Sequence, residues 1–426
     1  MHITRSFTFF CLALVMLAAL SGQAFSSTVA VGKCKPSLPQ FTTIGAAVTA
    51  VPAGSTVDVC PGIYPEQVLI TKNLTLIGVL SGTSYAAVVV PPAGGLVSNG
   101  SDILGRPVAA QIFVQGANNV TISHLTVDGN GNLLSGCGVN PIGIYYQNVS
   151  GKITDNAVRN QLMDPADQGC QVGLAINVES NSGAPIVTVS ANSVRNYDKN
   201  GITASGPGTG GGPAVTVSGN TVIGLGATSV IAQNGIQIGF GATGSVTGNY
   251  VADNIYTGPY YGSSGILIYA SAGLTVTSNT VESAQLGIVP ATDPTYGDAN
   301  GTIIKSNHVG GTQNYDAIDL CSDNNTAQSN VIYGSAESGI HVDDECPPST
   351  GSNTIATGNT INEACAGILI GPTSAGNTIA PNTVMNVTNT TLAGDTCTPS
   401  YTVFASTPEG SSGKQQSLRP SAYKMK

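Results

Sequence analysis

Residues 214–238 read AVTVSGNTVIGLGATSVIAQNGIQI, and most of the chain repeats this pattern. A strand ends at Asn220, loop residues follow, and Gly235-Ile236 begins another strand. The Asn slot recurs at intervals of 23 to 36 residues, and Leu125 fills it in an early unit. Two registers that repeat together indicate coils stacked on coils. The other Asn slots hold Asn156, Asn192, Asn249, Asn279, Asn307, Asn330, Asn359 and Asn382, and the other Gly-Ile slots hold Ile202, Ile266, Ile288, Ile318, Ile340 and Ile368.

The alternation of side chains within a unit predicts strands. Val215 and Val217 point one way and Thr216 the other, which is the period of two expected of a strand. Asn tolerates left-handed backbone angles, so the Asn slot predicts a sharp bend. Parallel strands joined by short bends, at roughly 22 to 30 residues per circuit, predict an all-β, single-domain parallel β-helix of about 10–12 coils.

The first 24 residues have the features of a signal peptide. His2 and Arg5 precede the apolar run 9–20, and Gly22-Gln23-Ala24 resembles a cleavage site. We therefore expect a secreted, periplasmic or cell-surface protein with no transmembrane segment once the signal is removed. Without Arg5, 13 basic residues face 23 acidic ones, a net charge near −10. This charge argues against nucleic acid or an anionic membrane as a partner.

The remaining chain divides into three parts. Residues 25–57 form an N-terminal segment and cap, because Phe41, Ile44, Ala47 and Val48 have the spacing of a short amphipathic helix. Residues 58–402 form the β-helix, and residues 403–426 a flexible C-terminal tail without periodicity. We expect a monomer. Eight cysteines in an exported chain favour disulfides, and their spacing predicts nearest-neighbour pairing among Cys34, Cys60, Cys137, Cys170, Cys321, Cys346, Cys365 and Cys397.

The segment FTTIGAAVTAVPAGSTVDVCPGIYPEQVLITKNLTLIGV, residues 41–79, resembles the opening of right-handed parallel β-helix proteins of the pectin-lyase-like superfamily. The resemblance implies a right-handed coil and an activity on acidic polysaccharides. Residues 62–66 (GIYPE) and 104–107 (LGRP) match short motifs of pectin methylesterases. The segments that hold the catalytic residues of methylesterases, polygalacturonases and alginate epimerases are absent, so no catalytic residue is carried over.

Alignment of the coils on the Gly-Ile slot places charged residues together on two rungs. Outward Asp319 falls beside outward His341, and Asp323 beside Glu345, with Cys321 and Cys346 fixing the segment. An Asp–His pair suits a general base and its orienting carboxylate, or a metal site. The candidate catalytic residues are Asp319, His341, Asp343 and Asp344, and the candidate metal ligands, for Ca²⁺, are Asp316, Asp323 and Glu345. The alternative is a solvated acidic loop whose Asp residues reflect turn chemistry.

Tyrosines supply a candidate surface for sugar rings: Tyr256, Tyr260, Tyr261 and Tyr315. The leading hypothesis is an exported β-helix protein that binds a uronate-containing polysaccharide or cell-surface glycan. Whether it is also an enzyme, as a polysaccharide lyase, epimerase or glycoside hydrolase, is left open by the sequence. One rival is a non-catalytic adhesion or structural rod, and a second is a periplasmic metal-handling factor.

Overall fold

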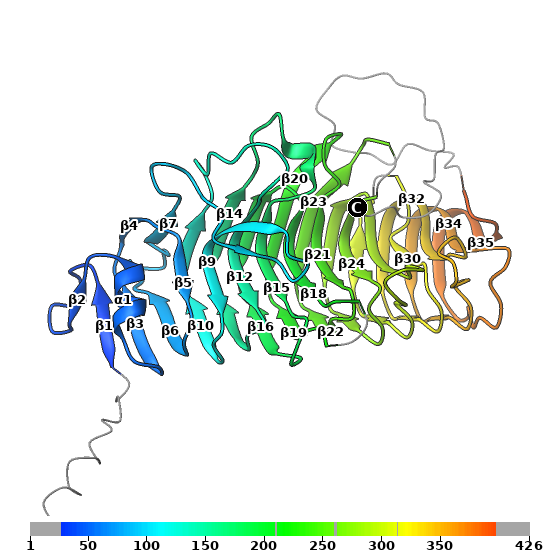
Figure 1. Ribbon diagram of the computed structural model, residues 1–426. Coiled ribbons are helices and arrows are strands. Elements are labelled where there is room, and N and C mark those ends of the chain that lie inside the picture. Colours follow the sequence, from blue (N-terminus) through cyan, green and yellow to red (C-terminus); the bar gives the residue numbers. More distant parts are fainter. Residues whose placement is uncertain (1–26, 209–210, 260–261, 313, 398–426) are drawn as a thin grey trace, which may run out of the picture.

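The computed structural model describes residues 27–397, apart from 209–210, 260–261 and 313. The predicted signal peptide, the tail 403–426 and the tyrosines at 260 and 261 therefore lie outside the described residues. The chain forms one elongated stack of coils, ordered along its length as in the sequence (Figure 1). No helix in the described part of the chain has both the length and the apolar character needed to cross a membrane.

Each regular coil contributes one strand to each of three rows. The first row is a 13-stranded sheet, and the other two rows together form a 22-stranded sheet. All pairings between coils are parallel; the antiparallel strand β8 (Gly100–Ser101) pairs with β9 inside a loop. The first row contains β1 (Thr28–Val31), β2 (Gln40–Phe41), β3 (Ser55–Val59), β6 (Leu74–Gly78), β10 (Val120–Ser123), β13 (Gly151–Thr154), β16 (Ile186–Ser190), β19 (Ala214–Ser218), β22 (Thr243–Thr247), β25 (Thr275–Thr277), β28 (Ile303–Lys305), β31 (Thr326–Gln328) and β33 (Ile355–Thr357).

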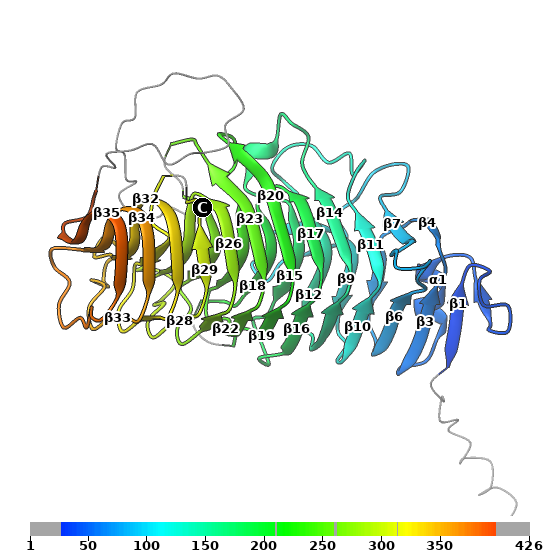
Figure 2. The ribbon, with the colours of Figure 1, turned by 180° about the vertical axis from the view of Figure 1, so that it is seen from behind.

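The second and third rows run side by side (Figure 2). The second row contains β4 (Gly62–Pro65), β7 (Ala87–Val90), β11 (Leu125–Asp128), β14 (Ala157–Gln161), β17 (Ser193–Tyr197), β20 (Thr221–Thr228), β23 (Tyr250–Tyr256), β26 (Thr280–Ala284) and β29 (His308–Gly310). The third row contains β5 (Val68–Ile70), β9 (Pro107–Gln115), β12 (Asn140–Gln147), β15 (Leu174–Glu179), β18 (Asn200–Ser205), β21 (Asn234–Gly239), β24 (Ser264–Tyr269), β27 (Leu286–Ala291) and β30 (Ile318–Leu320). Three long strands span both rows: β32 (Val331–Val342), β34 (Thr360–Ile370) and β35 (Thr383–Ala393).

The expected fold is confirmed. Val, Ile and Leu side chains from all three rows fill one continuous core along the stack. At ~1.5–3 kcal/mol for each buried aliphatic side chain, this core is the main source of stability. The short helix α1 (Ile44–Ala50) packs on β1, β3 and β5 at the first end, and Ile44, Ala47 and Val48 are its buried residues. Phe41, predicted to share the helical face, instead belongs to β2.

The Asn slot forms a buried ladder between the first and second rows. Asn220 donates through Nδ2 to Val189 O (2.9 Å) and Asn249 Oδ1 (2.9 Å), and its own Oδ1 accepts from Asn192 N (2.9 Å). The left-handed backbone lies one residue earlier, at Gly219 (φ 63°) in this coil. The side-chain hydrogen bonds therefore explain why this position is Asn. The prediction that Asn itself takes the left-handed backbone is wrong by one position, because the preceding residue takes it.

Four disulfides join nearest neighbours, as the spacing predicts. They are Cys34–Cys60, Cys137–Cys170, Cys321–Cys346 and Cys365–Cys397. A short 3₁₀-helix, η1 (Gln168–Cys170), ends at one of these cysteines, Cys170.

Candidate functional site

The outward face of the third row carries one side chain per rung at equivalent positions. Pairing of the strands places Thr203 beside Gln237, then Leu267, and then Val289. The next two rungs place Asp319 beside His341. In a strand, side chains alternate between faces, so Ile318 and Ile340 enter the core while Asp319 and His341 face outward.

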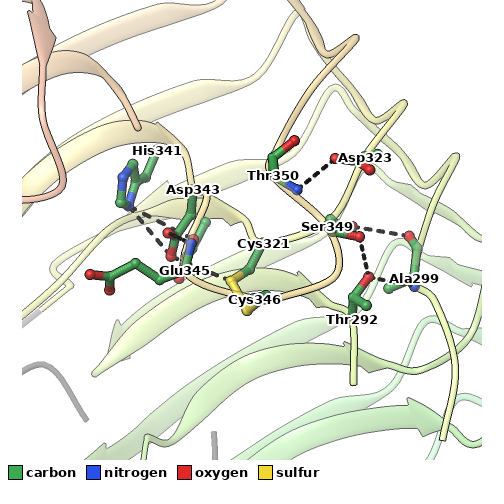
Figure 3. Close-up of a disulfide and its surroundings, with 12 residues drawn as sticks. Thr292, Ala299, Cys321, Asp323, His341, Asp343, Glu345, Cys346, Ser349 and Thr350 are labelled. Atoms are coloured by element: carbon green, nitrogen blue, oxygen red, sulfur yellow. Dashed lines mark hydrogen bonds and ion pairs between the residues drawn. A yellow bond between two sulfur atoms is a disulfide. The ribbon is translucent and has the colours of Figure 1, made fainter. Parts of the chain in front are cut away.

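Three carboxylates surround the imidazole of His341. Its Nδ1 lies 3.4 Å from Asp316 Oδ2, 3.8 Å from Asp343 Oδ2 and 4.0 Å from Asp319 Oδ1. The four side chains are almost fully buried, although they lie on the outer side of the sheet. We call Asp316, Asp319, His341 and Asp343 the carboxylate–histidine cluster; Figure 3 shows His341 directly beside Asp343.

Each member of the cluster is positioned by its own strand or loop. Asp316, just before β30, accepts hydrogen bonds through Oδ1 from Ser338 N (3.0 Å) and Ser338 Oγ (2.6 Å). Asp343, just after β32, accepts from Glu345 N (2.8 Å) and lies 3.4 Å from Cys321 Sγ. These contacts hold two carboxylates of neighbouring coils in a defined orientation, which a catalytic or metal site requires.

The electrostatics of the cluster favour a protonated imidazole. Burial lowers the pKa of His341, but the charges of Asp343, Asp316 and Asp319, together with the hydrogen bond to Asp316, raise that pKa to about 9. An opposite charge within a few ångströms stabilises the charged form of a group. His341 is therefore an imidazolium at neutral pH, and its charge offsets part of the repulsion among the three carboxylates.

The Cys321–Cys346 disulfide closes the segment beside the cluster (Figure 3). Cys321 lies on the rung of Asp319 and Cys346 follows Asp343, so the bond ties the two rungs together. Donor atoms of Asp316, Asp319 and His341 all lie within 4.8 Å of one another, the spacing that a metal ion needs. Cys321 is also close to Asp319 and Asp343, but its sulfur is in a disulfide and offers no thiolate ligand.

Other predicted site residues have different surroundings. Asp344 accepts from Thr373 N and Oγ1 (both 2.6 Å) in the loop after β34, and these bonds lower its pKa despite partial burial. Asp323 accepts from Thr350 N and Ser352 N (both 2.9 Å) and so fixes a turn. Glu345 is exposed at the rim of the cluster. Of the predicted metal ligands Asp316, Asp323 and Glu345, the structure places Asp316 in the cluster and the other two outside it.

The predicted tyrosine surface is not assembled in the described residues. Tyr256 is buried and donates from its hydroxyl to Pro259 O (3.1 Å), so its ring does not offer a face to a sugar. Tyr315 is half-buried and packs against the apolar patch of Tyr269 and Val289. Lys305, the basic residue nearest in sequence, lies on β28 in the other sheet and away from the cluster.

An amide network on the same face was missed by sequence reasoning. Asn200 Nδ2 donates to Thr203 Oγ1 and Gln237 Oε1 (both 3.1 Å), and Asn234 Nδ2 donates to Asn200 Oδ1 (3.2 Å) and Gln237 Oε1 (3.1 Å). The signal was present in the sequence, because Asn precedes the Gly-Ile pair in two successive coils, as NGITA and NGIQI.

Comparison with known proteins identifies the type of repeat. Residues 174–384 match the family described as the right handed beta helix region. The matched coils form a right-handed parallel β-helix, and the coils on either side continue the same stack. No protein of curated function matches the chain.

Solved structures of this β-helix type share the fold at low sequence identity. The GH136 lacto-N-biosidase from Eubacterium ramulus is 11% identical and covers 84% of this chain and 68% of its own, with a TM-score of 0.59. The A-module of the Azotobacter vinelandii mannuronan C-5 epimerase AlgE6 is 20% identical and covers 79% and 94%, with a TM-score of 0.45. At 11% identity the likeness to the GH136 protein is one of fold.

Proposed function

We propose that this β-helix protein is an exported enzyme that cleaves a polysaccharide at the carboxylate–histidine cluster. The observation that carries the proposal is the placement of three carboxylates within 4.0 Å of one buried imidazole. Export is supported by the apolar leader and by the four disulfides. The structurally similar GH136 protein is a lacto-N-biosidase, which is in keeping with a glycan substrate.

The cluster supplies both partners of acid–base cleavage. Hydrolysis of a glycosidic bond uses one carboxyl group to protonate the leaving oxygen and a second to activate water or attack the sugar. Asp319 and Asp343 take these two roles, because Asp316 is already held by Ser338 and His341. The imidazolium of His341 supplies the proton that one of these carboxyl groups passes to the leaving oxygen, and the proton taken from water restores it.

The face beside the cluster suits a chain of sugar rings. Thr203, Gln237, Leu267, Val289 and Asp319 occupy successive rungs ~4.8 Å apart. All five are buried, so a polymer lying along the rod would meet one side chain per rung only after the covering loops move. Amide groups donate to and accept from sugar hydroxyls. A uronate-containing chain, the substrate class that the sequence predicts, would need a cation between its carboxylates and those of the cluster.

Access to the cluster requires movement of the segments that cover it. Asp319 is 4% exposed and His341 0% exposed. Residues 394–397 lie over β34, where Cys397 is bonded to Cys365 and packs on Leu369, the rung partner of His341. The N–H of Cys397 also donates to Glu337 Oε1 (3.1 Å). We expect substrate binding to displace residues 394–397 from their position over β34.

The test is an activity screen on neutral glycans, pectate and alginate, each with and without Ca²⁺, with product detected as new reducing ends. Asp319→Asn and Asp343→Asn each lower kcat by about 10²–10⁴-fold, the usual effect of losing a general acid or base. Asp298→Asn, at an exposed position in the loop after β27, is the matched control and leaves activity unchanged. The proposal fails if no polymer is cleaved, which favours the structural rod, or if the variants retain full activity.

Metal binding is the second candidate function, and the 4.8 Å donor spacing of Asp316, Asp319 and His341 favours it. Metal must displace the proton of His341, so binding releases a proton at neutral pH. Calorimetry with Ca²⁺ and with Cu²⁺, in two buffers of different ionisation enthalpy, measures both affinity and proton release. His341→Ala abolishes the proton release if the ion binds at the cluster.

A further inference from the structure

A second group of side chains lies on the outward face of the second row, around the edge from the cluster. Tyr250 on β23, Glu282 on β26, His308 on β29 and Tyr333 on β32 come from four successive coils (Figure 2). We call these four residues the tyrosine platform. Tyr333 and His341 belong to the same strand but face different sides of the rod, so the platform is separate from the proposed catalytic site.

The ring of Tyr333 lies flat over a glycine. Glu282, Gly310 and Tyr333 occupy one column on three successive rungs. A Cβ atom at position 310 would lie only 2.1 Å from Cζ of Tyr333 and 2.4 Å from Cε1, so the glycine makes room for the ring. The hydroxyl of Tyr333 extends past the rung of Gly310 and donates to Glu282 Oε1 (2.9 Å), two rungs away. One face of the ring is thus held against the backbone, and the opposite face is turned outward.

Glu282 links the two tyrosines of the platform. Tyr250 donates to its Oε2 (3.0 Å) and Tyr333 to its Oε1 (2.9 Å), so each carboxylate oxygen accepts one tyrosine hydroxyl. A carboxylate oxygen has a further lone pair, so Glu282 can accept additional hydrogen bonds. The ring of His308 lies 5.1 Å from that of Tyr333 at an interplanar angle of 54°. Tyr250 is 37% exposed and His308 is also exposed, so the platform is open to solvent.

These features meet the requirements of a sugar-binding surface. An aromatic ring with one fixed face presents an apolar plane at a small entropy cost, and sugar rings stack their C–H faces on such planes. A carboxylate beside the ring accepts hydrogen bonds from neighbouring sugar hydroxyls. The carboxylate of Glu282 makes the local charge negative, and burial together with that charge raises the pKa of the neighbouring Asp253. That charge disfavours uronate or sulfated sugars.

We propose that the tyrosine platform is a second, non-catalytic binding site for a neutral, hydroxyl-rich glycan. The ring of Tyr333 stacks on a sugar, Glu282 accepts hydrogen bonds from its hydroxyls, and Tyr250 and His308 border the site. The platform anchors the rod to a polymer surface. It does not depend on cleavage at the carboxylate–histidine cluster.

The experiment is native affinity electrophoresis of the full-length protein in gels that contain galactomannan, a soluble β-1,3-glucan, hydroxyethylcellulose or alginate. At least one neutral polymer retards the wild-type protein, and alginate does not. Tyr333→Ala and Glu282→Gln each weaken binding roughly tenfold or more. Tyr333→Phe keeps the ring and loses only the hydroxyl bond to Glu282, so its affinity falls by a smaller factor.

Two control variants keep the result specific to the platform. Ile355→Ala removes a similarly exposed apolar side chain from the other sheet and leaves retardation unchanged. Asp298→Asn, at an exposed loop position outside both proposed sites, likewise leaves retardation unchanged. Circular dichroism confirms that each variant is folded. The proposal is overturned if no neutral polymer retards the protein, if alginate retards it more strongly, or if Tyr333→Ala and Glu282→Gln both bind as the wild type does.

Discussion

Asp198 is a buried carboxyl group whose pKa is raised, because burial disfavours its charged form. Its pKa is about 7 in the folded chain, although the N–H of Met163 donates to it. A raised carboxyl pKa gives stability that is fully present below the ordinary pKa and is lost as the pH rises through about 7. The loss reaches about 4 kcal/mol at most, since one pKa unit is worth 1.36 kcal/mol.

We expect Asp198→Asn to remove most of this pH dependence. The variant, unlike the wild type, loses little stability between pH 5 and 8.5, which urea unfolding at several pH values measures. Asp128→Asn is the contrasting control. Hydrogen bonds from Asn160, Asn130 and Arg159 lower the pKa of Asp128 in spite of burial, so its contribution is lost as the pH falls. Parallel pH profiles for wild type and Asp198→Asn contradict the assignment.

His341 is a base whose pKa is also raised, but by neighbouring charges and not by burial. The neighbouring carboxylates raise its pKa to about 9 against the effect of burial, so its stabilising charge is complete below its ordinary pKa and is lost as the pH rises through about 9. NMR titration of the imidazole signals assigns that high pKa to His341, and Asp316→Asn lowers it. Enzyme activity, if present, declines over the same pH range. A pKa for His341 near the ordinary value contradicts the cluster geometry.

At the scale of the element, the Asn ladder joins neighbouring coils through side chains. Removal of one amide leaves buried donors and acceptors on both adjacent rungs without partners, and each such group costs about 1–3 kcal/mol. We expect Asn220→Ala to lower the free energy of unfolding by about 2–4 kcal/mol. Asn382→Ala, at the partly exposed end of the ladder, costs less. Urea titration followed by circular dichroism compares the two, and equal losses would show that ladder position is irrelevant.

The Cys321–Cys346 bond is the element that ties the two rungs of the cluster. It closes a sequence separation of 25 residues, which corresponds to about 3 kcal/mol in the chain-entropy estimate. The double variant Cys321→Ser/Cys346→Ser therefore unfolds at lower urea concentration and loses activity, because Asp343 is no longer fixed beside Cys321. Cys137→Ser/Cys170→Ser, five rungs away by strand pairing, loses comparable stability but keeps activity. Retained activity in the first variant would remove the positioning role of this bond.

At the scale of the whole molecule, the rod must protect the exposed strand edges at its ends. Glu66 fixes the cap at the first end, since its oxygens accept from Ile44 N (2.7 Å) and Gly45 N (2.9 Å) at the start of α1. Loss of a helix N-terminal acceptor costs about 0.5–2 kcal/mol. We expect Glu66→Ala to loosen α1 and to increase self-association, measured by light scattering after size-exclusion chromatography. Asp298→Ala removes the same charge at an exposed loop position and is the control.

Much of the fold was predictable because each coil repeats the same local requirements. Aliphatic residues alternate along the strands, Asn marks the bend and Gly-Ile marks the third row, so Asp319 and His341 could be placed on adjacent rungs by counting. Asp323 and Asp344 could not be placed in this way. They lie in loops whose paths depend on hydrogen bonds from Thr350 and Thr373, residues of distant segments. The tyrosine platform could not be predicted either. The side chain of Tyr333 extends past the rung of Gly310 to reach Glu282, and the repeat gives no sign of that contact.

The sequence alone determined the coil and the row to which each repeated residue belongs, and it favoured the pairing of cysteines one coil apart. These features follow from short-range periodicity, which every coil repeats. Only the tertiary structure decided that three carboxylates converge on His341 and that they are buried. The reason is physical: side-chain direction, loop path and burial depend on contacts between coils, and a single charge cluster in a repeating chain has no periodic signal.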